Sequence, residues 1–130
     1  MKSKFIIAIS LVATIFLASF PVQALARANP NIDQASIVFS SSMGAGFSLT
    51  ASNNFNVSIT SVKLEVKESN GTWSFVKNLP APSSATNVTF YNRDMDYSSH
   101  CTKGKTYRIK ATFNAGSESV SRTSAEKTYN

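Results

Sequence analysis

Short segments in which apolar and polar residues alternate constrain the fold of this chain more than any other feature. The clearest segment covers residues 62–67, VKLEVK, where every second residue is apolar. A period of two places successive side chains on opposite faces, which is the geometry of a half-buried β-strand. Asn70-Gly71 follows, and this dipeptide is the strongest short signal for a hairpin turn. The pattern therefore predicts an antiparallel hairpin with a return strand that starts near Trp73.

The same pattern recurs along the chain, with turn residues every ~8 to 14 positions, as is typical of all-β proteins. Seven strands are predicted, at residues 35–40, 47–52, 57–67, 73–77, 88–91, 107–113 and 119–129. The apolar phase slips by one residue between Ile59 and Val62, and such a slip exchanges the two faces of a strand. We therefore expect a bend or bulge near Thr60-Ser61.

The segments between the predicted strands are polar or contain Pro and Gly. Residues 41–46 and 114–117 are predicted turns, and residues 92–103 are predicted to form a polar connection. Residues 79–84 should be irregular, because proline cannot donate a hydrogen bond to a strand ladder. The last strand is polar, and we expect it to be an edge strand that Arg122 and Lys127 protect from further pairing.

The first 26 residues have the pattern of a secretory signal peptide. Lys2 and Lys4 precede an apolar run over residues 5–20, and Ala24-Leu25-Ala26 fits the small-x-small cleavage rule. The run has roughly 16 residues, fewer than the ~20 that span a bilayer. A retained membrane anchor is the alternative. No later stretch approaches spanning length, so we expect no transmembrane span after cleavage.

Cleavage would leave a polar lead-in at residues 27–34 and one domain at residues 35–130, secreted to the cell exterior. These 104 residues carry eleven Lys and Arg against seven Asp and Glu, a net charge of +4. Small secreted domains often depend on disulfides, but a single Cys allows no intramolecular disulfide. Packing alone must therefore hold this domain together, which favours a well-formed β-sandwich.

The segment from Cys101 to Ala111, CTKGKTYRIKA, resembles the E–F corner and strand F of a fibronectin type III domain. The pattern of that family is Leu-x-Pro-Gly-Thr-x-Tyr-x-Val-x-Val/Ala, which Gly104, Tyr107, Ile109 and Ala111 match. Residues 114–119 resemble the F–G turn of the same family, and residues 70–76 resemble its C–C′ hairpin, which often carries a Trp after the turn.

Two positions depart from this pattern, because Cys101 stands where Leu is usual and Lys103 where Pro is usual; the predicted second strand also lacks a Trp. The resemblance implies a seven-stranded antiparallel β-sandwich of fibronectin type III-like or immunoglobulin-like type. It also implies that Cys101 points into the core as an unreactive thiol. The whole chain resembles a family of short secreted bacterial proteins of unknown function, which share a signal peptide, a Trp-bearing hairpin and a Gly-x-x-Tyr-Arg strand.

The sequence offers no convincing catalytic or metal-binding set. His100 and Cys101 are adjacent, but neighbouring residues on an extended chain point to opposite faces. Asn92, Asp94 and Asp96 place oxygens at alternating positions, which leaves a weak calcium site as an alternative to an ordinary polar loop. We therefore predict a protein that is not an enzyme and that has no catalytic residues, cofactor or metal.

A basic face is the main candidate for a binding site. If the strands at residues 62–67 and 107–113 are neighbours, then Lys63, Lys67, Arg108 and Lys110 share one outward face with Glu65. Such a face could attract anionic polymers of a cell wall or acidic glycans. The alternative is an ordinary solvated sheet face with cross-strand ion pairs.

Trp73 is a weaker candidate residue for the same site. It could stack on a sugar ring, or it could pack over its own hairpin. The predicted ligand-binding residues are Lys63, Lys67, Trp73, Arg108 and Lys110.

The leading hypothesis is a non-catalytic extracellular binding module. Its partner would be a cell-wall polymer, a glycan or another extracellular protein. Nucleic acid is not expected, because a net charge of +4 is small for that role. The alternative is a small secreted cationic toxin or antimicrobial protein, although no long basic amphipathic helix supports it.

Overall fold

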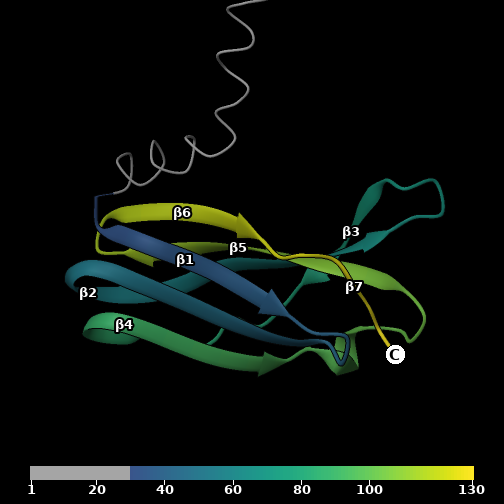
Figure 1. Ribbon diagram of the computed structural model, residues 1–130, viewed down its shortest axis with the longest axis horizontal. Coiled ribbons are helices and arrows are strands. Elements are labelled where there is room, and N and C mark those ends of the chain that lie inside the picture. Colours follow the sequence, from purple (N-terminus) through teal and green to yellow (C-terminus); the bar gives the residue numbers. More distant parts are fainter. Residues whose placement is uncertain (1–29) are drawn as a thin grey trace, which may run out of the picture.

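The computed structural model describes residues 30–130; the predicted signal peptide, residues 1–26, lies outside the described residues. Seven antiparallel strands form one curled sheet (Figure 1). The strands are β1 (Ile32–Phe39), β2 (Gly44–Lys67), β3 (Trp73–Asn78), β4 (Ala85–Asp96), β5 (Thr106–Ala115), β6 (Glu118–Thr123) and β7 (Lys127–Thr128), and a 3₁₀ turn, η2 (Ser98–His100), precedes β5. The prediction of an all-β chain is confirmed.

The 24-residue strand β2 organises the sheet because its two halves have different neighbours. The first half pairs with β1 and β4, so that Leu49 lies opposite both Ala35 and Tyr91. The second half pairs with β3 and β5, so that Leu64 lies opposite both Lys77 and Ile109. Strands β6 and β7 pair with β5.

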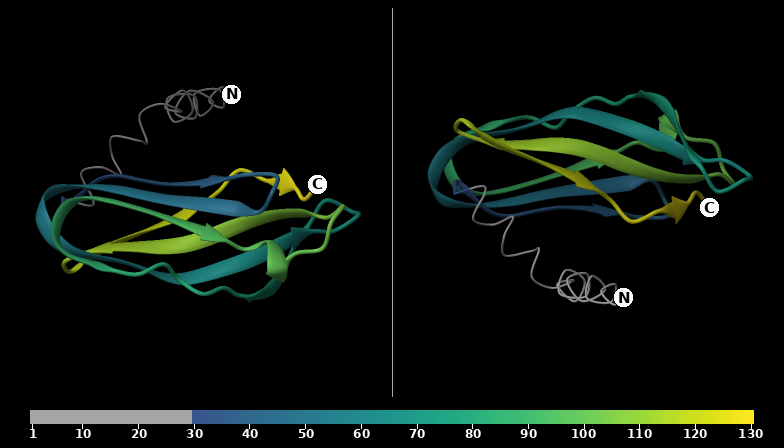
Figure 2. Two further views of the ribbon diagram at one scale, coloured as in Figure 1. Left: turned by 90° about the horizontal axis from the view of Figure 1, so that it is seen from below. Right: turned by 90° about the horizontal axis from the view of Figure 1, so that it is seen from above.

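The curl brings the two halves of the sheet face to face around a buried core (Figure 2). Phe47 in the first half of β2 meets Phe113 in β5, with ring centroids 6.2 Å apart. Both rings are fully buried, as are Leu64 and Ile109. Truncating such a phenylalanine to alanine typically costs about 3–5 kcal/mol, so this contact is a main source of stability. The arrangement is compatible with a β-sandwich.

Side-chain hydrogen bonds close the two open sides of the curl. On one side, the buried Tyr91 and Tyr97 hydroxyls donate to the carbonyls of Ser83 and Pro80, at 2.6 and 2.7 Å. These bonds hold the irregular connection 79–84, which the prolines keep out of the ladder. On the other side, the Arg122 guanidinium donates to the Ala35 carbonyl at 3.0 Å and so joins β6 to β1.

The predicted irregularity near Thr60-Ser61 is confirmed as a β-bulge. The pairing of β2 with β5 shifts between Thr60 and Lys63, and Ser61 has a φ of 52°. The predicted hairpin at Asn70-Gly71 is confirmed as well, but only Gly71 has a positive φ, at 90°. The Gly71 amide donates to the Glu68 carbonyl, and the Glu68 amide donates to the Thr72 carbonyl.

Several predicted boundaries are wrong. β1 begins at Ile32 rather than Ala35, so the predicted lead-in at residues 27–34 overlaps this strand. Residues 92–96 belong to β4 rather than to a polar loop, because residues 44–48 pair with them along their whole length. Gly44 and Gly46 lie within β2 rather than in a turn. The predicted last strand is divided at Ser124, whose amide donates to the Ile109 carbonyl.

Candidate functional site

The outward face of β2 and β5 carries the predicted basic residues. The strand register places Lys63 directly opposite Lys110, and Glu65 directly opposite Arg108. The expectation that these two strands are neighbours is confirmed. The four cations of this face are nevertheless not equivalent, because two of them already have acidic partners within the protein.

Arg108 is held by two contacts within the fold. Its Nε donates to Glu65 Oε1 at 2.7 Å, and its guanidinium lies 4.2 Å from the centroid of the Trp73 ring. The side chains of Arg108 and Glu65 are only 27% and 17% exposed. Trp73 is half-buried, and the contact of its ring is with Arg108 of β5. Arg108, Glu65 and Trp73 therefore stabilise the junction of β3, β2 and β5.

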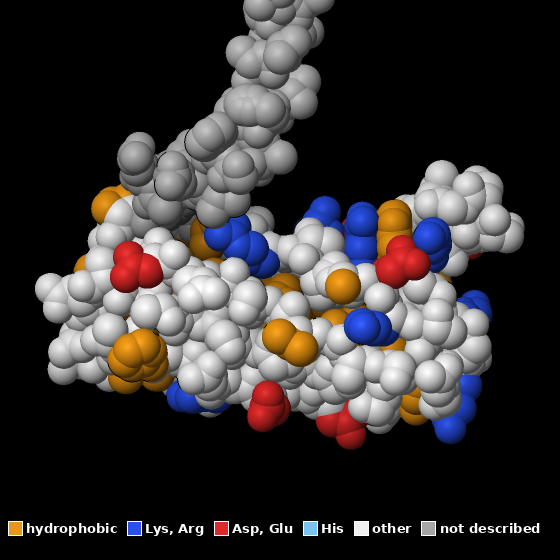
Figure 3. Space-filling view, in the orientation of Figure 1, with side chains coloured by type: hydrophobic (Ala, Val, Ile, Leu, Met, Phe, Trp, Pro, Cys, Tyr) orange, Lys and Arg blue, Asp and Glu red, His pale blue; other side chains and the backbone are white. Residues whose placement is uncertain are grey.

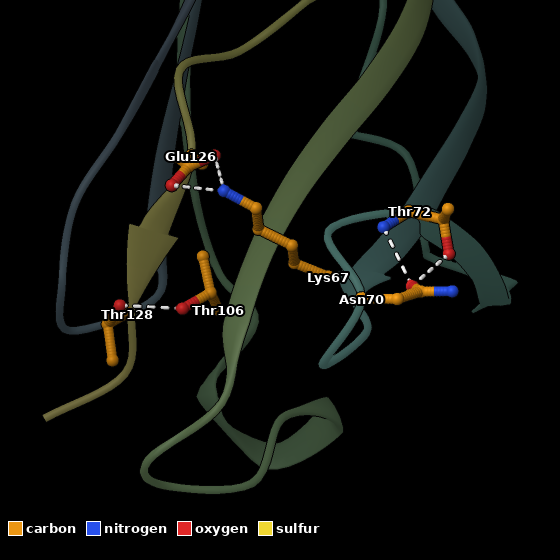
Figure 4. Close-up of polar contacts among 6 residues, drawn as sticks. All are labelled: Lys67, Asn70, Thr72, Thr106, Glu126 and Thr128. Atoms are coloured by element: carbon orange, nitrogen blue, oxygen red, sulfur yellow. Dashed lines mark hydrogen bonds and ion pairs between the residues drawn. The ribbon is translucent and has the colours of Figure 1, made fainter.

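Lys67 is paired with the C-terminal segment. Its Nζ lies 3.1 Å from Glu126 Oε1, while the Thr106 and Thr128 hydroxyls join β5 to β7 at 2.7 Å (Figure 4). The ion pair is solvent-exposed, and such pairs contribute about 0–1 kcal/mol. Lys67 thus helps to hold the end of the chain against the sheet.

Asn70 and Thr72 form a separate polar contact at the tip of the β2–β3 hairpin (Figure 4). The Asn70 carboxamide oxygen accepts from the Thr72 amide at 3.0 Å and from the Thr72 hydroxyl at 2.7 Å. These bonds stabilise the turn and involve no residue of the basic face.

Lys63 and Lys110 have no acidic partner among the described residues. Like charges directly opposite each other in a sheet repel, so this pair destabilises the fold slightly. The two side chains line a hollow of about 110 Å³, which Ser61, Ala111, Thr112 and Ser121 also line. Residues that carry two ammonium groups and three hydroxyls therefore border one small depression, whose lining surface is mostly apolar.

The bulge at Ser61 lies at the edge of this hollow, because Ser61 is one of the residues that line it. An extra residue in β2 interrupts the pairing between Thr60 and Lys63, and bulges often re-aim side chains beside binding sites. The hydroxyls of Ser61, Thr112 and Ser121 were not among the predicted site residues. The phase slip near Thr60-Ser61 was the only sequence signal for them, since nothing local indicates which strand lies opposite.

A second hollow has the opposite electrostatic character. It measures about 420 Å³ and is lined by residues of β1, β2 and β4, among them Val38, Gly46 and Asp94. In Figure 3, acidic side chains lie along β4 with a basic one beside them and also over β1, whereas Lys and Arg are more frequent near β6, β5 and β3. An anion would therefore be repelled near Asp94 and attracted near Lys63.

The adjacent residues His100 and Cys101 have different surroundings in the fold. Burial raises the pKa of the Cys101 thiol to about 11, although the nearby Lys77 charge lowers it in part. Cys101 is half-buried rather than fully enclosed, and the His100 ring packs edge-on against Tyr97 at 6.2 Å. No group of three His, Cys, Asp or Glu that could hold a metal ion lies within residues 30–130.

The alternating oxygens at residues 92–96 lie on one strand, β4. Asn92 accepts a hydrogen bond from the Ser48 hydroxyl at 2.7 Å. Asp96 accepts from the Ser98 amide at 2.9 Å, and hydrogen bonds from Ser98 lower the pKa of Asp96. These side chains are spaced along β4 and form no loop of the kind that wraps a calcium ion.

Comparison of the chain with known protein families, with curated proteins and with solved structures gave no match. No helix in the described part of the chain is long and apolar enough to cross a membrane.

Proposed function

We propose that this protein is a secreted, non-catalytic extracellular module that binds an anionic polymer through Lys63 and Lys110. The observation that carries the proposal is the opposition of these two lysines across β2 and β5 without an acidic partner in residues 30–130. A bound anion would relieve the repulsion between the two ammonium groups. The neighbouring hydroxyls could donate hydrogen bonds to the same anion.

The proposal includes a fold of fibronectin type III-like sandwich type and export after loss of residues 1–26. The strand order supports this fold, with β1–β2–β4 in one half and β3–β2–β5–β6 in the other. Tyr107 supports it too, because its hydroxyl accepts a hydrogen bond from the Thr102 amide at 2.8 Å. This bond corresponds to the tyrosine corner of immunoglobulin-like sandwiches.

The test is a binding measurement of the purified protein on poly(glycerol phosphate), polygalacturonate and neutral cellulose. We expect binding to the two anionic polymers alone, weakened by salt because salt screens exposed charges. The variant Lys63→Glu/Lys110→Glu should lose this binding.

The matched control is Lys105→Glu/Lys127→Glu, which makes the same change in net charge away from the hollow. Both of its lysines are exposed, and the described part of the chain gives neither side chain a polar partner. Retention of binding in this control would assign the effect to the Lys63–Lys110 pair. Equal loss in both variants, or no binding of any anionic polymer, would overturn the proposal.

A further inference from the structure

We infer that the anion held at this hollow is a phosphate diester of a polymer chain rather than a carboxylate. This inference rests on the proposed function and names the class of ligand for the same site. It depends on three features of the hollow: the type of cation, the number of hydroxyl donors and their arrangement around the depression.

The first feature is that the available cations are both lysines. The two parallel donors of an arginine guanidinium match a planar carboxylate and also a phosphate, whereas lysine binds phosphate as a point charge. The nearest arginine on this face, Arg108, already donates to Glu65 and stacks on Trp73. The ammonium groups of Lys63 and Lys110 act instead as point charges with no preferred plane, which suits a tetrahedral phosphate.

The second feature is the set of hydroxyls around the lysines. Ser61, Thr112 and Ser121 line the hollow, each from a different strand. Within residues 30–130 the nearby Asn114 carboxamide bonds to Ser58 and Thr60, and Ser121 takes part only through its carbonyl, so the three hydroxyls form no side-chain hydrogen bond there. A phosphate diester presents two charged oxygens and two ester oxygens, so it can accept from both ammonium groups and from hydroxyls in several directions.

The third feature is the size and position of the hollow. A volume of about 110 Å³ is suited to one small anionic group and is too small to enclose a sugar ring with its substituents. The hollow is open to solvent on the outward face of the sheet, so a polymer chain could continue past it in both directions. The ligand is therefore a linear polymer that is held by its charged linkages.

The left-handed backbone at Ser61 fits this interpretation. A φ of 52° is unfavourable for a residue with a Cβ, and such strain tends to persist at functional sites. Glycine would relieve the strain but would remove the hydroxyl from the hollow. The presence of serine is explained if this hydroxyl contacts the ligand.

The experiment compares the affinity of the intact protein for poly(glycerol phosphate) and for polygalacturonate of similar length and charge, at the same ionic strength. We expect the phosphate polymer to bind at least tenfold more tightly. Equal or tighter binding of the carboxylate polymer would overturn this inference while leaving the proposed function intact. Failure of both polymers to bind would overturn the proposed function itself.

Hydroxyl variants test the same inference from the side of the protein. Thr112→Val and Ser61→Ala should reduce the preference for the phosphate polymer several-fold and change binding of polygalacturonate little. Ser61→Gly should have the same effect as Ser61→Ala, because both variants remove the hydroxyl while only one keeps the backbone strain. Thr86→Val, at an exposed position on β4, is the matched control and should keep the preference. An unchanged preference in all three hydroxyl variants would contradict the inference.

Discussion

Individual residues of the basic face differ in what their charges already contact. Arg108 neutralises Glu65, and Lys67 lies 3.1 Å from Glu126. Of the four cations on this face, only Lys63 and Lys110 form no ion pair within residues 30–130. A sequence pattern can place all four cations on one face, but it cannot show which of them are already neutralised. The distinction depends on Glu126, which is 59 positions from Lys67 along the chain.

Cys101 provides a prediction about a single side chain. Its pKa is raised to about 11 by burial, so the reactive thiolate is scarce at neutral pH. At pH 8 we expect labelling by a thiol reagent to be about one hundredfold slower than for a free thiol. The rate should rise about tenfold for each pH unit between 7 and 10, in proportion to the thiolate fraction.

The control for Cys101 is the same reaction in denaturant, where the thiol should react at the rate of a free thiol. Rapid labelling of the native protein at pH 7 would show that the thiol is activated rather than suppressed. It would also reopen the question of a chemical role for this residue.

Among the structural elements, the β2–β3 hairpin has a turn that depends on one glycine. Gly71 has a φ of 90°, and a Cβ added there would meet no atom within 4 Å. The cost of Gly71→Ala is therefore conformational rather than steric, and we expect a loss of about 1–2 kcal/mol in the free energy of unfolding. Urea unfolding of the variant measures this loss.

Ser69→Ala is the matched control, because it lies in the same turn without a positive φ. We expect it to change stability by less than about 0.5 kcal/mol. Equal losses in the two variants would mean that the left-handed backbone at Gly71 contributes nothing to the stability of the turn.

Local sequence patterns predict some of these elements correctly and miss others. The alternation in residues 62–67 and the Asn-Gly turn correctly predict one hairpin, because both signals depend on neighbouring residues. The phase slip correctly predicts the bulge at Ser61. In contrast, the continuation of β4 through residues 92–96 depends on pairing with residues 44–48. Polar side chains on the solvent face of a strand resemble those of a loop, so the local pattern predicts a loop there.

For the molecule as a whole, the buried tyrosines link stability to alkaline pH. Burial raises the pKa of Tyr97 and of Tyr91 above the ordinary value, and it raises the pKa of Cys101 to about 11. In the unfolded chain these groups lose their protons near their ordinary values, from about pH 9 to 10. The native protein still holds its protons in that range, so the unfolded state binds fewer protons and stability falls as pH rises.

We therefore expect the free energy of unfolding to be insensitive to these groups below about pH 8 and to decline above about pH 9. Each group can contribute a slope of up to about 1.4 kcal/mol per pH unit. The variant Tyr97→Phe separates this effect from general alkaline damage. It lacks the hydrogen bond to the Pro80 carbonyl, so it should be less stable at pH 7. It also cannot ionise, so its stability should decline less steeply between pH 9 and 11. Urea unfolding at several pH values measures both slopes, and parallel declines in the two proteins would show that Tyr97 is not a source of the alkaline instability.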